Sequence, residues 1–135
     1  MTDDLLFVYG TLRKGCPHSR ALRLAAEAAY VGAASASGHL YRVADYPGFV
    51  PGSEGRVCGD LFRLARPHVT LAWLDEYEEC APHFPAPHEY RRQRLTVDGP
   101  HGGAEAWTYV YALPVGNLEP IDGGDFLACA PKDGG

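Results

Sequence analysis

The segment Leu5–Gly15, LLFVYGTLRKG, decides where the first strand of the fold ends. An apolar run that stops at a glycine predicts a short buried strand over Leu5–Tyr9, followed by a turn at Gly10. The turn has two interpretations. It is either a plain tight connection or a turn whose backbone N–H groups face a ligand.

The residues of this turn are suited to ligand binding but do not require it. Gly10 allows a close approach of the backbone and a positive φ. Thr11 and Leu12 follow, and concave arrays of successive N–H groups bind carboxylates or stabilise oxyanions. Neither G-x-G-x-x-G nor G-x-x-x-x-G-K-[ST] is present, which argues against a phosphate loop. Arg13 and Lys14 are expected at the surface with no assigned role, and both interpretations of the turn stay open.

Length and composition fit one globular domain. The chain has 135 residues, of which 46% are hydrophobic and 21% are charged, close to the averages of soluble domains. Its 16 glycines and 11 prolines favour many turns and short elements over long helices. No repeat or linker divides the sequence, so we expect one domain over residues 1–130 and a flexible tail over 131–135.

The charge balance argues against several classes of function. The formal net charge is −5, and the longest basic run is RRQR, Arg91–Arg94. We expect no nucleic-acid partner, because such binding depends on neutralising phosphates. We also expect no membrane partner, since no stretch has the apolar length of a membrane span. The acidic N-terminus is unlike a secretory signal, so a cytoplasmic protein is expected, and the oligomeric state is left open.

Cysteines and histidines form no recognisable metal or redox motif. The cysteines stand at positions 16, 58, 80 and 129 without a C-x-x-C pair, and none of the six histidines lies in H-E-x-x-H. No serine lies in G-x-S-x-G. We therefore expect free thiols in a reducing compartment, no metal site and no cofactor.

The predicted elements do not alternate regularly along the chain. Helices are expected at Ser19–Ala26 and from Pro67 towards Pro82, since proline suits the first helical turn. Strands are expected at Ala28–Ser37, His39–Val43, Val57–Leu64, Glu89–Val97 and Ala104–Leu113, with a Pro/Gly-rich loop at Asp45–Gly55 and a hairpin turn at Asp98–Gly103. This order favours an α+β fold, in which helices pack against a curled or closed sheet.

Helical geometry sets apart one carboxylate of the sequence LAWLDEYEE. At 100° per residue, Leu71, Leu74 and Glu78 fall on one stripe, whereas Glu76 and Glu79 point away from it. Burial disfavours a charged carboxylate and raises its pKa, which suits a proton acceptor working near neutral pH. The alternative is that Glu78 ends the helix and turns to solvent, or pairs with an arginine such as Arg91.

Aromatic residues offer further candidates without a distinctive pattern. Tyr46, which precedes Pro47, either lines a pocket or fills the core, and the same two alternatives apply to Tyr109 and Tyr111.

Five motifs occur in one order along most of the chain. They are YGTLRKG (Tyr9–Gly15), DYPG (Asp45–Gly48), GRVCGDLFRL (Gly55–Leu64), LDEYE (Leu74–Glu78) and EYRRQRLTV (Glu89–Val97), and the segment IDGGDFLA (Ile121–Ala128) follows them. Together they resemble the γ-glutamylcyclotransferase-like family, nearest to γ-glutamylamine cyclotransferase and small bacterial relatives. The first and fourth motifs are the specific ones.

The resemblance implies a small mixed β-barrel with flanking short helices and a pocket between the first loop and a glutamate. By position, that catalytic glutamate is Glu78. The substrate-binding residues are expected to be Tyr9, Gly10, Thr11, Leu12, Tyr46 and Tyr90. Many relatives have glycine directly after the glutamate, where this chain has Glu79. The longer insert APHFPAPH, Ala81–His88, leaves the substrate identity open.

The activity that the resemblance implies is intramolecular aminolysis of a small-molecule γ-glutamyl amide. Glu78 would act as general base, and the products would be 5-oxoproline and a free amine, without metal or cofactor. One alternative is a non-catalytic small-molecule binding protein on the same fold. Another is a tailoring enzyme that removes a γ-glutamyl protecting group.

Overall fold

The computed structural model describes residues 4–10, 12–14, 16, 18–44 and 46–126. The predicted tail over 131–135, Thr11 and Cys129 lie outside these ranges. The elements in chain order are β1 Leu5–Val8, α1 Ser19–Glu27, β2 Ala28–Arg42, β3 Pro47–Leu64, α2 Pro67–Tyr77, β4 Tyr90–Gly99, β5 Gly102–Tyr111, β6 Glu119–Pro120 and the 3-10 turn η1 Asp122–Gly124.

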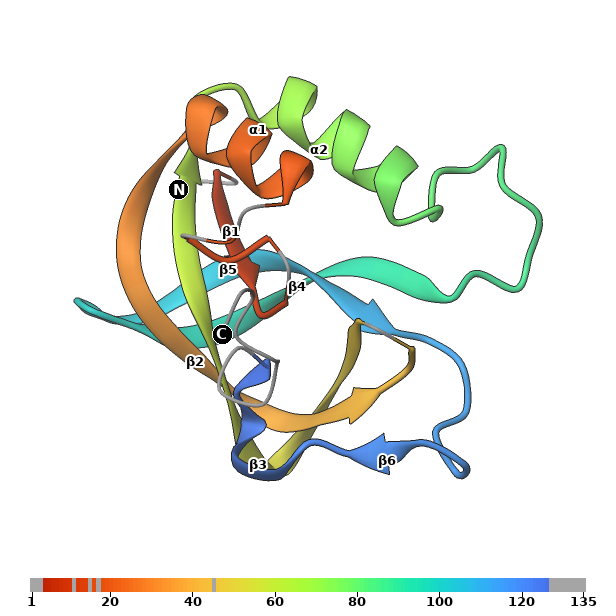
Figure 1. Ribbon diagram of the computed structural model, residues 1–135. Coiled ribbons are helices and arrows are strands. Elements are labelled where there is room, and N and C mark those ends of the chain that lie inside the picture. The colour runs from red at the N-terminus through yellow and green to blue at the C-terminus, as the bar shows by residue number, and fades with distance from the viewer. Residues whose placement is uncertain (1–3, 11, 15, 17, 45, 127–135) are drawn as a thin grey trace.

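The strands form a mixed sheet that curls into a partially closed ring, as the α+β expectation and the resemblance to a small barrel predicted. The strand order is β3-β1-β5-β4-β2-β6, and a further pairing of β2 with β3 brings the sheet back on itself. β1 runs antiparallel to β3 and parallel to β5. The two helices lie together at one end of the ring, and the segment from α2 to β4 extends away from it (Figure 1).

The predicted loop at Asp45–Gly55 is wrong, because most of this segment belongs to β3. Pro47–Pro51 pairs in antiparallel register with Gly38–Arg42 of β2. Within the described sheet, β1 pairs only with the far end of β3, at Asp60–Arg63. Proline has no backbone N–H to donate, and it is tolerated at Pro47 because no second strand there requires that donor. The Pro/Gly cluster is thus an irregularity within a long strand.

The two strands predicted at Ala28–Ser37 and His39–Val43 are one strand, β2, with a register shift between Ser37 and Gly38. Gly38 has a φ of 144°, and a Cβ there would lie 2.4 Å from the Val50 carbonyl oxygen. Glycine therefore lets β2 bend without breaking its pairing to β3. The hairpin at Asp98–Gly103 is confirmed, since Asp98 pairs with Gly103.

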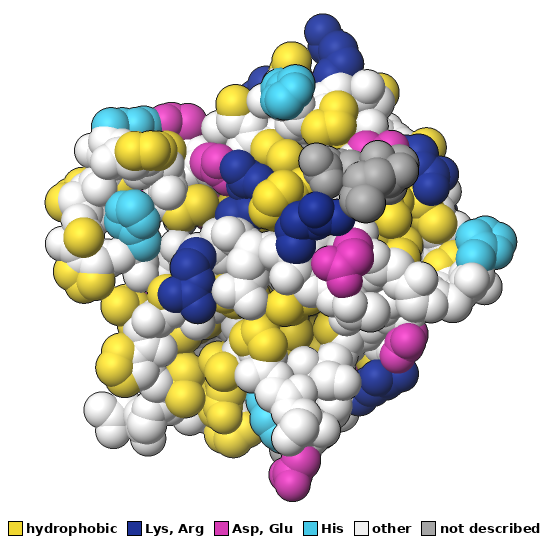
Figure 2. Space-filling view, turned by 180° about the vertical axis from the view of Figure 1, so that it is seen from behind, with side chains coloured by type: hydrophobic (Ala, Val, Ile, Leu, Met, Phe, Trp, Pro, Cys, Tyr) yellow, Lys and Arg dark blue, Asp and Glu magenta, His cyan; other side chains and the backbone are white. Residues whose placement is uncertain are grey.

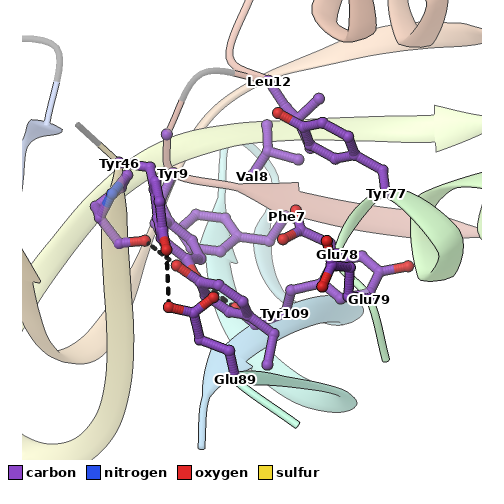
Figure 3. Close-up of a pocket in the computed structure, with 13 residues that line it drawn as sticks. Phe7, Val8, Tyr9, Leu12, Tyr46, Tyr77, Glu78, Glu79, Glu89 and Tyr109 are labelled. Carbon is purple, nitrogen blue, oxygen red and sulfur yellow. Dashed lines mark hydrogen bonds between the residues drawn. The ribbon is translucent and has the colours of Figure 1, made fainter. Parts of the chain in front are cut away.

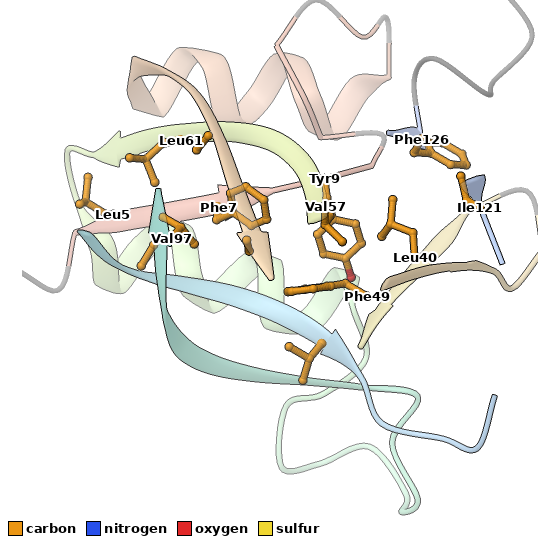
Figure 4. Packing of buried hydrophobic residues seen from close by; sticks show 14 residues of the cluster. Leu5, Phe7, Tyr9, Leu40, Phe49, Val57, Leu61, Val97, Ile121 and Phe126 are labelled. Atoms are coloured by element: carbon orange, nitrogen blue, oxygen red, sulfur yellow. The ribbon is translucent and has the colours of Figure 1, made fainter. Parts of the chain in front are cut away.

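Apolar side chains from β1 fill both sides of the sheet. Leu5, Phe7 and Tyr9 point into the interior of the ring, where Phe7 and Tyr9 pack against Phe49 with ring centroids 6.4 and 5.4 Å apart (Figure 4). Leu6 and Val8 alternate to the opposite face and meet the helices. The short predicted strand is therefore buried on both faces, which explains its continuous apolar sequence.

The helices are joined to each other by a carboxylate. Glu27, at the end of α1, accepts hydrogen bonds from the Thr70 hydroxyl at 2.6 Å and the Trp73 indole at 2.9 Å, both on α2. These two bonds lower the pKa of Glu27 to about 2. Leu24 of α1 and Leu71 and Leu74 of α2 complete the contact with the sheet. This packing fixes the direction of α2 and of the residues at its C-terminal end.

Within the described ranges, neither helix has the length and apolar character needed to cross a membrane. On the face seen from behind, lysine and arginine side chains are interspersed with acidic and apolar ones (Figure 2).

Candidate active site

A cavity of about 240 Å³ lies between the end of β1, the end of α2 and the start of β4. Its volume is just below the range of about 300–1,000 Å³ that is typical for drug-sized ligands. The described residues that line it are Phe7, Val8, Tyr9, Gly10, Leu12, Tyr46, Pro47, Tyr77, Glu78, Glu79, Glu89, Tyr90 and Tyr109 (Figure 3). Every described residue that was predicted to bind substrate is among them.

The loop after β1 forms one wall of this Glu78 cavity. Tyr9 and Leu12 are buried, and the Arg13 amide donates to the Gly10 carbonyl oxygen at 3.1 Å, which closes a tight turn. Of the two features that glycine allows at this position, a positive φ is not adopted by Gly10. It is needed for close approach instead, since a Cβ at this position would lie 3.0 Å from Cγ of Pro47. Thr11 lies outside the described residues.

Glu78 caps the C-terminal end of α2, and its side chain faces the cavity rather than open solvent. Burial raises the pKa of Glu78 to about 7, and the negative charge of Glu89 contributes to the increase. No ion pair of Glu78 occurs among the described residues. Glu76 is exposed and lies outside the lining, as the helical stripe predicted, whereas Glu79, which was also expected to point away, contributes to the lining. The predicted alternative of a pair with Arg91 is not formed.

A second carboxylate in the cavity, Glu89, was missed as a site residue. It accepts a hydrogen bond from the Tyr46 hydroxyl at 2.8 Å, and the two side chains are drawn together in Figure 3. Glu89 precedes β4 at the end of a proline-rich loop, where no periodicity assigns a face to a side chain. The only sequence signal is its place next to Tyr90 in the motif EYRRQRLTV.

Buried tyrosines build the walls of the cavity through their hydroxyl groups. The Tyr9 hydroxyl donates to the Tyr109 carbonyl oxygen, and the Tyr90 hydroxyl donates to the Pro47 carbonyl oxygen at 2.6 Å. Burial raises the pKa of both phenols well above the usual value. The two hydroxyl hydrogens are therefore used within the protein, and a bound molecule meets the rings or the oxygen lone pairs.

The end of α2 is held against the sheet by Asp75. Its carboxylate accepts two hydrogen bonds from Arg92 of β4, at 2.8 and 3.1 Å, and one from the Tyr109 hydroxyl at 2.6 Å. A bidentate arginine pair fixes orientation as well as distance. Because Asp75 lies one helical turn before Glu78, this contact sets the position of the Glu78 carboxylate relative to β4 and β5.

Sequence comparisons identify the family. The profile described as "Gamma-glutamyl cyclotransferase, AIG2-like" matches residues 6–128. The chain belongs to this family. It is 37% identical over 123 residues to the γ-glutamylcyclotransferase family protein YtfP of Escherichia coli, covering 90% of this chain and 95% of YtfP.

A second relative agrees with this assignment, and a solved structure agrees with the fold. A γ-glutamylaminecyclotransferase of Bos taurus is 31% identical over 121 residues, which is 79% of this chain and 65% of that protein. The crystal structure of an AIG2-like protein from mouse superimposes with a TM-score of 0.69 at 23% identity, covering 90% of this chain and 88% of that one. This likeness supports the fold.

The backbone conformation at the position after Glu78 explains why the resemblance leads us to expect glycine there. Glu79 has a φ of 58°, in the left-handed region. Its N–H bonds to the Glu76 carbonyl oxygen at 3.1 Å, and the Cys80 N–H bonds to the Asp75 carbonyl oxygen at 3.0 Å. These two bonds form a Schellman motif, which usually places glycine in the left-handed position. This chain adopts the same backbone with a glutamate.

Arg13 is not the surface residue that we expected. Its guanidinium donates to Asp60 of β3 at 3.3 Å and to Asp125 at 2.7 Å, and only 13% of its side chain is exposed. The Lys14 amide also donates to Asp60, at 2.9 Å. The Arg13 cluster (Arg13, Asp60 and Asp125) therefore holds the loop after β1 in place through residues that do not line the Glu78 cavity. Lys14 itself is exposed, as predicted.

The described residues include no metal-binding cluster and no disulfide. Among the described residues, no three His, Cys, Asp or Glu side chains lie close enough together to hold a metal ion. None of the described cysteines, Cys16, Cys58 and Cys80, is in a disulfide. Burial and the nearby carboxylates raise the pKa of Cys80 to about 11, which opposes a role as a thiolate nucleophile.

Proposed function

We propose that this protein converts a γ-glutamyl amide into 5-oxoproline and a free amine, with Glu78 as the general base. The observation that carries the proposal is the Glu78 carboxylate, which lines the same cavity as Tyr9, Gly10 and Leu12 and has a pKa of about 7. A base with a pKa near the working pH is partly deprotonated and still basic enough to accept a proton.

The reaction begins with the α-ammonium group of the substrate beside Glu78. Glu78 takes one proton from it, and the freed amine attacks the γ-carbonyl carbon of the same molecule. A C–N bond forms, the carbonyl becomes an oxyanion, and a five-membered ring closes. Because both reacting groups belong to one molecule, the protein needs only to hold the folded conformation.

The second half of the reaction expels the amine. Protonated Glu78 returns its proton to the leaving nitrogen and then accepts the second proton of the ring nitrogen, which became positively charged in the attack. The original amide C–N bond breaks, the oxyanion becomes the lactam carbonyl of 5-oxoproline, and the free amine takes up that second proton as an ammonium. Backbone N–H groups of the loop after β1 either stabilise the oxyanion or hold the α-carboxylate of the substrate. The hydrogen-bonded tyrosine walls keep the cavity in shape throughout.

The test is 5-oxoproline release from a panel of γ-glutamyl amines and dipeptides by the wild type and Glu78→Gln. Loss of a positioned general base is expected to reduce the rate on the order of 10²–10⁴-fold. Glu76→Gln is the matched control, since it removes the same charge from an exposed position of the same helix. Equal rates for the wild type and Glu78→Gln would contradict the proposal, and binding without turnover by the wild type would favour the non-catalytic alternative.

A further inference from the structure

The Glu78 cavity has acidic groups and no basic ones among its described lining residues. Glu78, Glu79 and Glu89 contribute to the lining, and none of the other ten described lining residues is Lys, Arg or His. Partly buried carboxylates elsewhere are paired: Asp60 with Arg13 and Asp75 with Arg92. Neither Glu78 nor Glu89 has such a pair within the described part of the chain. The negative charge of the cavity is therefore left for a bound molecule to balance.

Glu89 is held in place by one main-chain and one side-chain hydrogen bond. Its backbone carbonyl accepts the Ala112 N–H at 2.8 Å, which fixes the main chain at the start of β4. Its carboxylate accepts the Tyr46 hydroxyl at 2.8 Å, and the Tyr46 ring packs against Tyr90 with centroids 6.3 Å apart. A carboxylate offers about four acceptor positions, so one hydroxyl bond orients it without satisfying it.

A carboxylate beside tyrosine rings is a recognition site for an organic ammonium group. The carboxylate supplies charge-assisted hydrogen bonds, and the faces of tyrosine rings attract cations. The reaction already assigns the proton transfer and the α-ammonium group to Glu78. A second cationic group of the substrate has to come from the amine half, since the γ-glutamyl half carries only one ammonium.

We infer that Glu89 and Tyr46 form a subsite for a positively charged group in the amine half of the substrate. This inference rests on the proposed function. The substrate class is then a γ-glutamyl conjugate of a diamine or polyamine, rather than of an amino acid whose carboxylate would face Glu89. A carboxylate in that place would meet a like charge without any described cation in the lining to offset it.

The experiment uses three γ-glutamyl amides with the same four-carbon chain and different terminal charge. They are the conjugates of 1,4-diaminobutane, butylamine and 4-aminobutanoate. Dissociation constants are measured by calorimetry at pH 8 with Glu78→Gln protein, and with Glu78→Gln combined with either Glu89→Gln or Glu76→Gln. Glu76 is exposed and lies outside the cavity lining, so its variant controls for the change in total charge.

The diamine conjugate is expected to bind on the order of 10- to 100-fold more tightly than the butylamine conjugate, because hydrogen bonds to charged groups are strong. The aminobutanoate conjugate is expected to bind most weakly. Glu89→Gln should remove most of the preference for the diamine, whereas Glu76→Gln should keep it. Tyr46→Phe, which removes the orienting hydroxyl and no charge, should reduce the same preference by a smaller factor.

Three outcomes overturn the inference: equal affinity for the three compounds, no measurable binding of the diamine conjugate, or an equal loss of affinity for all three in Glu89→Gln. The last would place the α-ammonium group at Glu89. Turnover of the same compounds by the wild type is a separate readout. Turnover without charge preference overturns the subsite and leaves the proposed function standing. Charge-selective binding without turnover supports a cation site at Glu89 and contradicts the proposed reaction.

Discussion

The loop after β1 has acidic residues on both of its sides, and the two groups differ in their partners. Behind the loop, Asp60 and Asp125 are bridged by Arg13. In front of it, Glu78 and Glu89 face a cavity without a described cation. The first group is paired with a cation and holds the backbone. The second is not, and burial together with the charge of Glu89 raises the pKa of Glu78 to about 7, so its carboxylate is available for proton transfer.

The largest effect on stability is expected from breaking the paired group. Arg13→Met leaves Asp60, which is 5% exposed, without its cation. Removing one partner of a buried pair is expected to lower the free energy of unfolding by about 3 kcal/mol, as measured by urea denaturation. The matched control is Arg56→Met, because the Arg56–Asp98 pair is more than half exposed on both sides and should contribute less than about 1 kcal/mol. Equal losses in the two variants would contradict the comparison.

Removing the unpaired carboxylate is expected to have the opposite sign. The pKa of Glu78 is about 7 in the folded protein, against 4.5 for an unperturbed glutamate. The folded state therefore binds this proton more tightly, and stability falls as pH rises from about 4.5 to about 7. Glu78→Gln should be more stable than the wild type by about 2–3 kcal/mol at pH 8 and nearly equal to it at pH 4. Thermal denaturation at the two pH values measures the difference, and a destabilised variant at pH 8 would contradict it.

The pH dependence of turnover sharpens the same contrast. Because Glu78 must be deprotonated to act as a base, kcat/KM is expected to rise with pH and to level off above about 7. The charge of Glu89 contributes to this raised pKa, so Glu89→Gln should move the rise to lower pH, by less than about 2 pH units. Glu76→Gln should leave it in place. A Glu89→Gln profile that coincides with the wild type would show that burial alone sets the pKa.

The smallest effect is expected at Glu79, the residue that follows the C-cap of α2. Glu79 has a φ of 58°, which costs a residue with a side chain roughly 1–2 kcal/mol. Glu79→Gly is expected to raise the free energy of unfolding by about 1 kcal/mol after the greater freedom of the unfolded chain is allowed for. Glu79→Ala keeps the strain and should give no gain. Chemical denaturation of both variants tests this difference.

The parts of the site that could be predicted are those set by local geometry. Helical periodicity pointed Glu78 inward even though it lies one residue beyond α2, because its φ and ψ of −83° and −1° continue the helical turn. The first strand and its turn were predicted from five consecutive residues. The ring of strands followed from the irregular order of short elements together with the family resemblance.

The parts that were missed depend on contacts between distant segments. Arg13 looks like a surface residue until Asp60, 47 positions later, and Asp125 are placed beside it. The Pro/Gly-rich segment at Asp45–Gly55 becomes a strand only because β2 pairs with it. Glu89 lies in a segment without regular structure, so no period could show that it shares a cavity with Glu78.

The ion pair between Arg13 and Asp125 also has a consequence for biosynthesis. The two residues are 112 positions apart, and a ribosome adds about 5–20 residues per second. The loop that forms one wall of the cavity therefore leaves the ribosome on the order of ten seconds before its last anchor is made. During that interval β1 also waits for its partners in β3 and β5. β1 is thus synthesised well before it can reach its final conformation, and the nascent chain exposes this apolar strand during that interval.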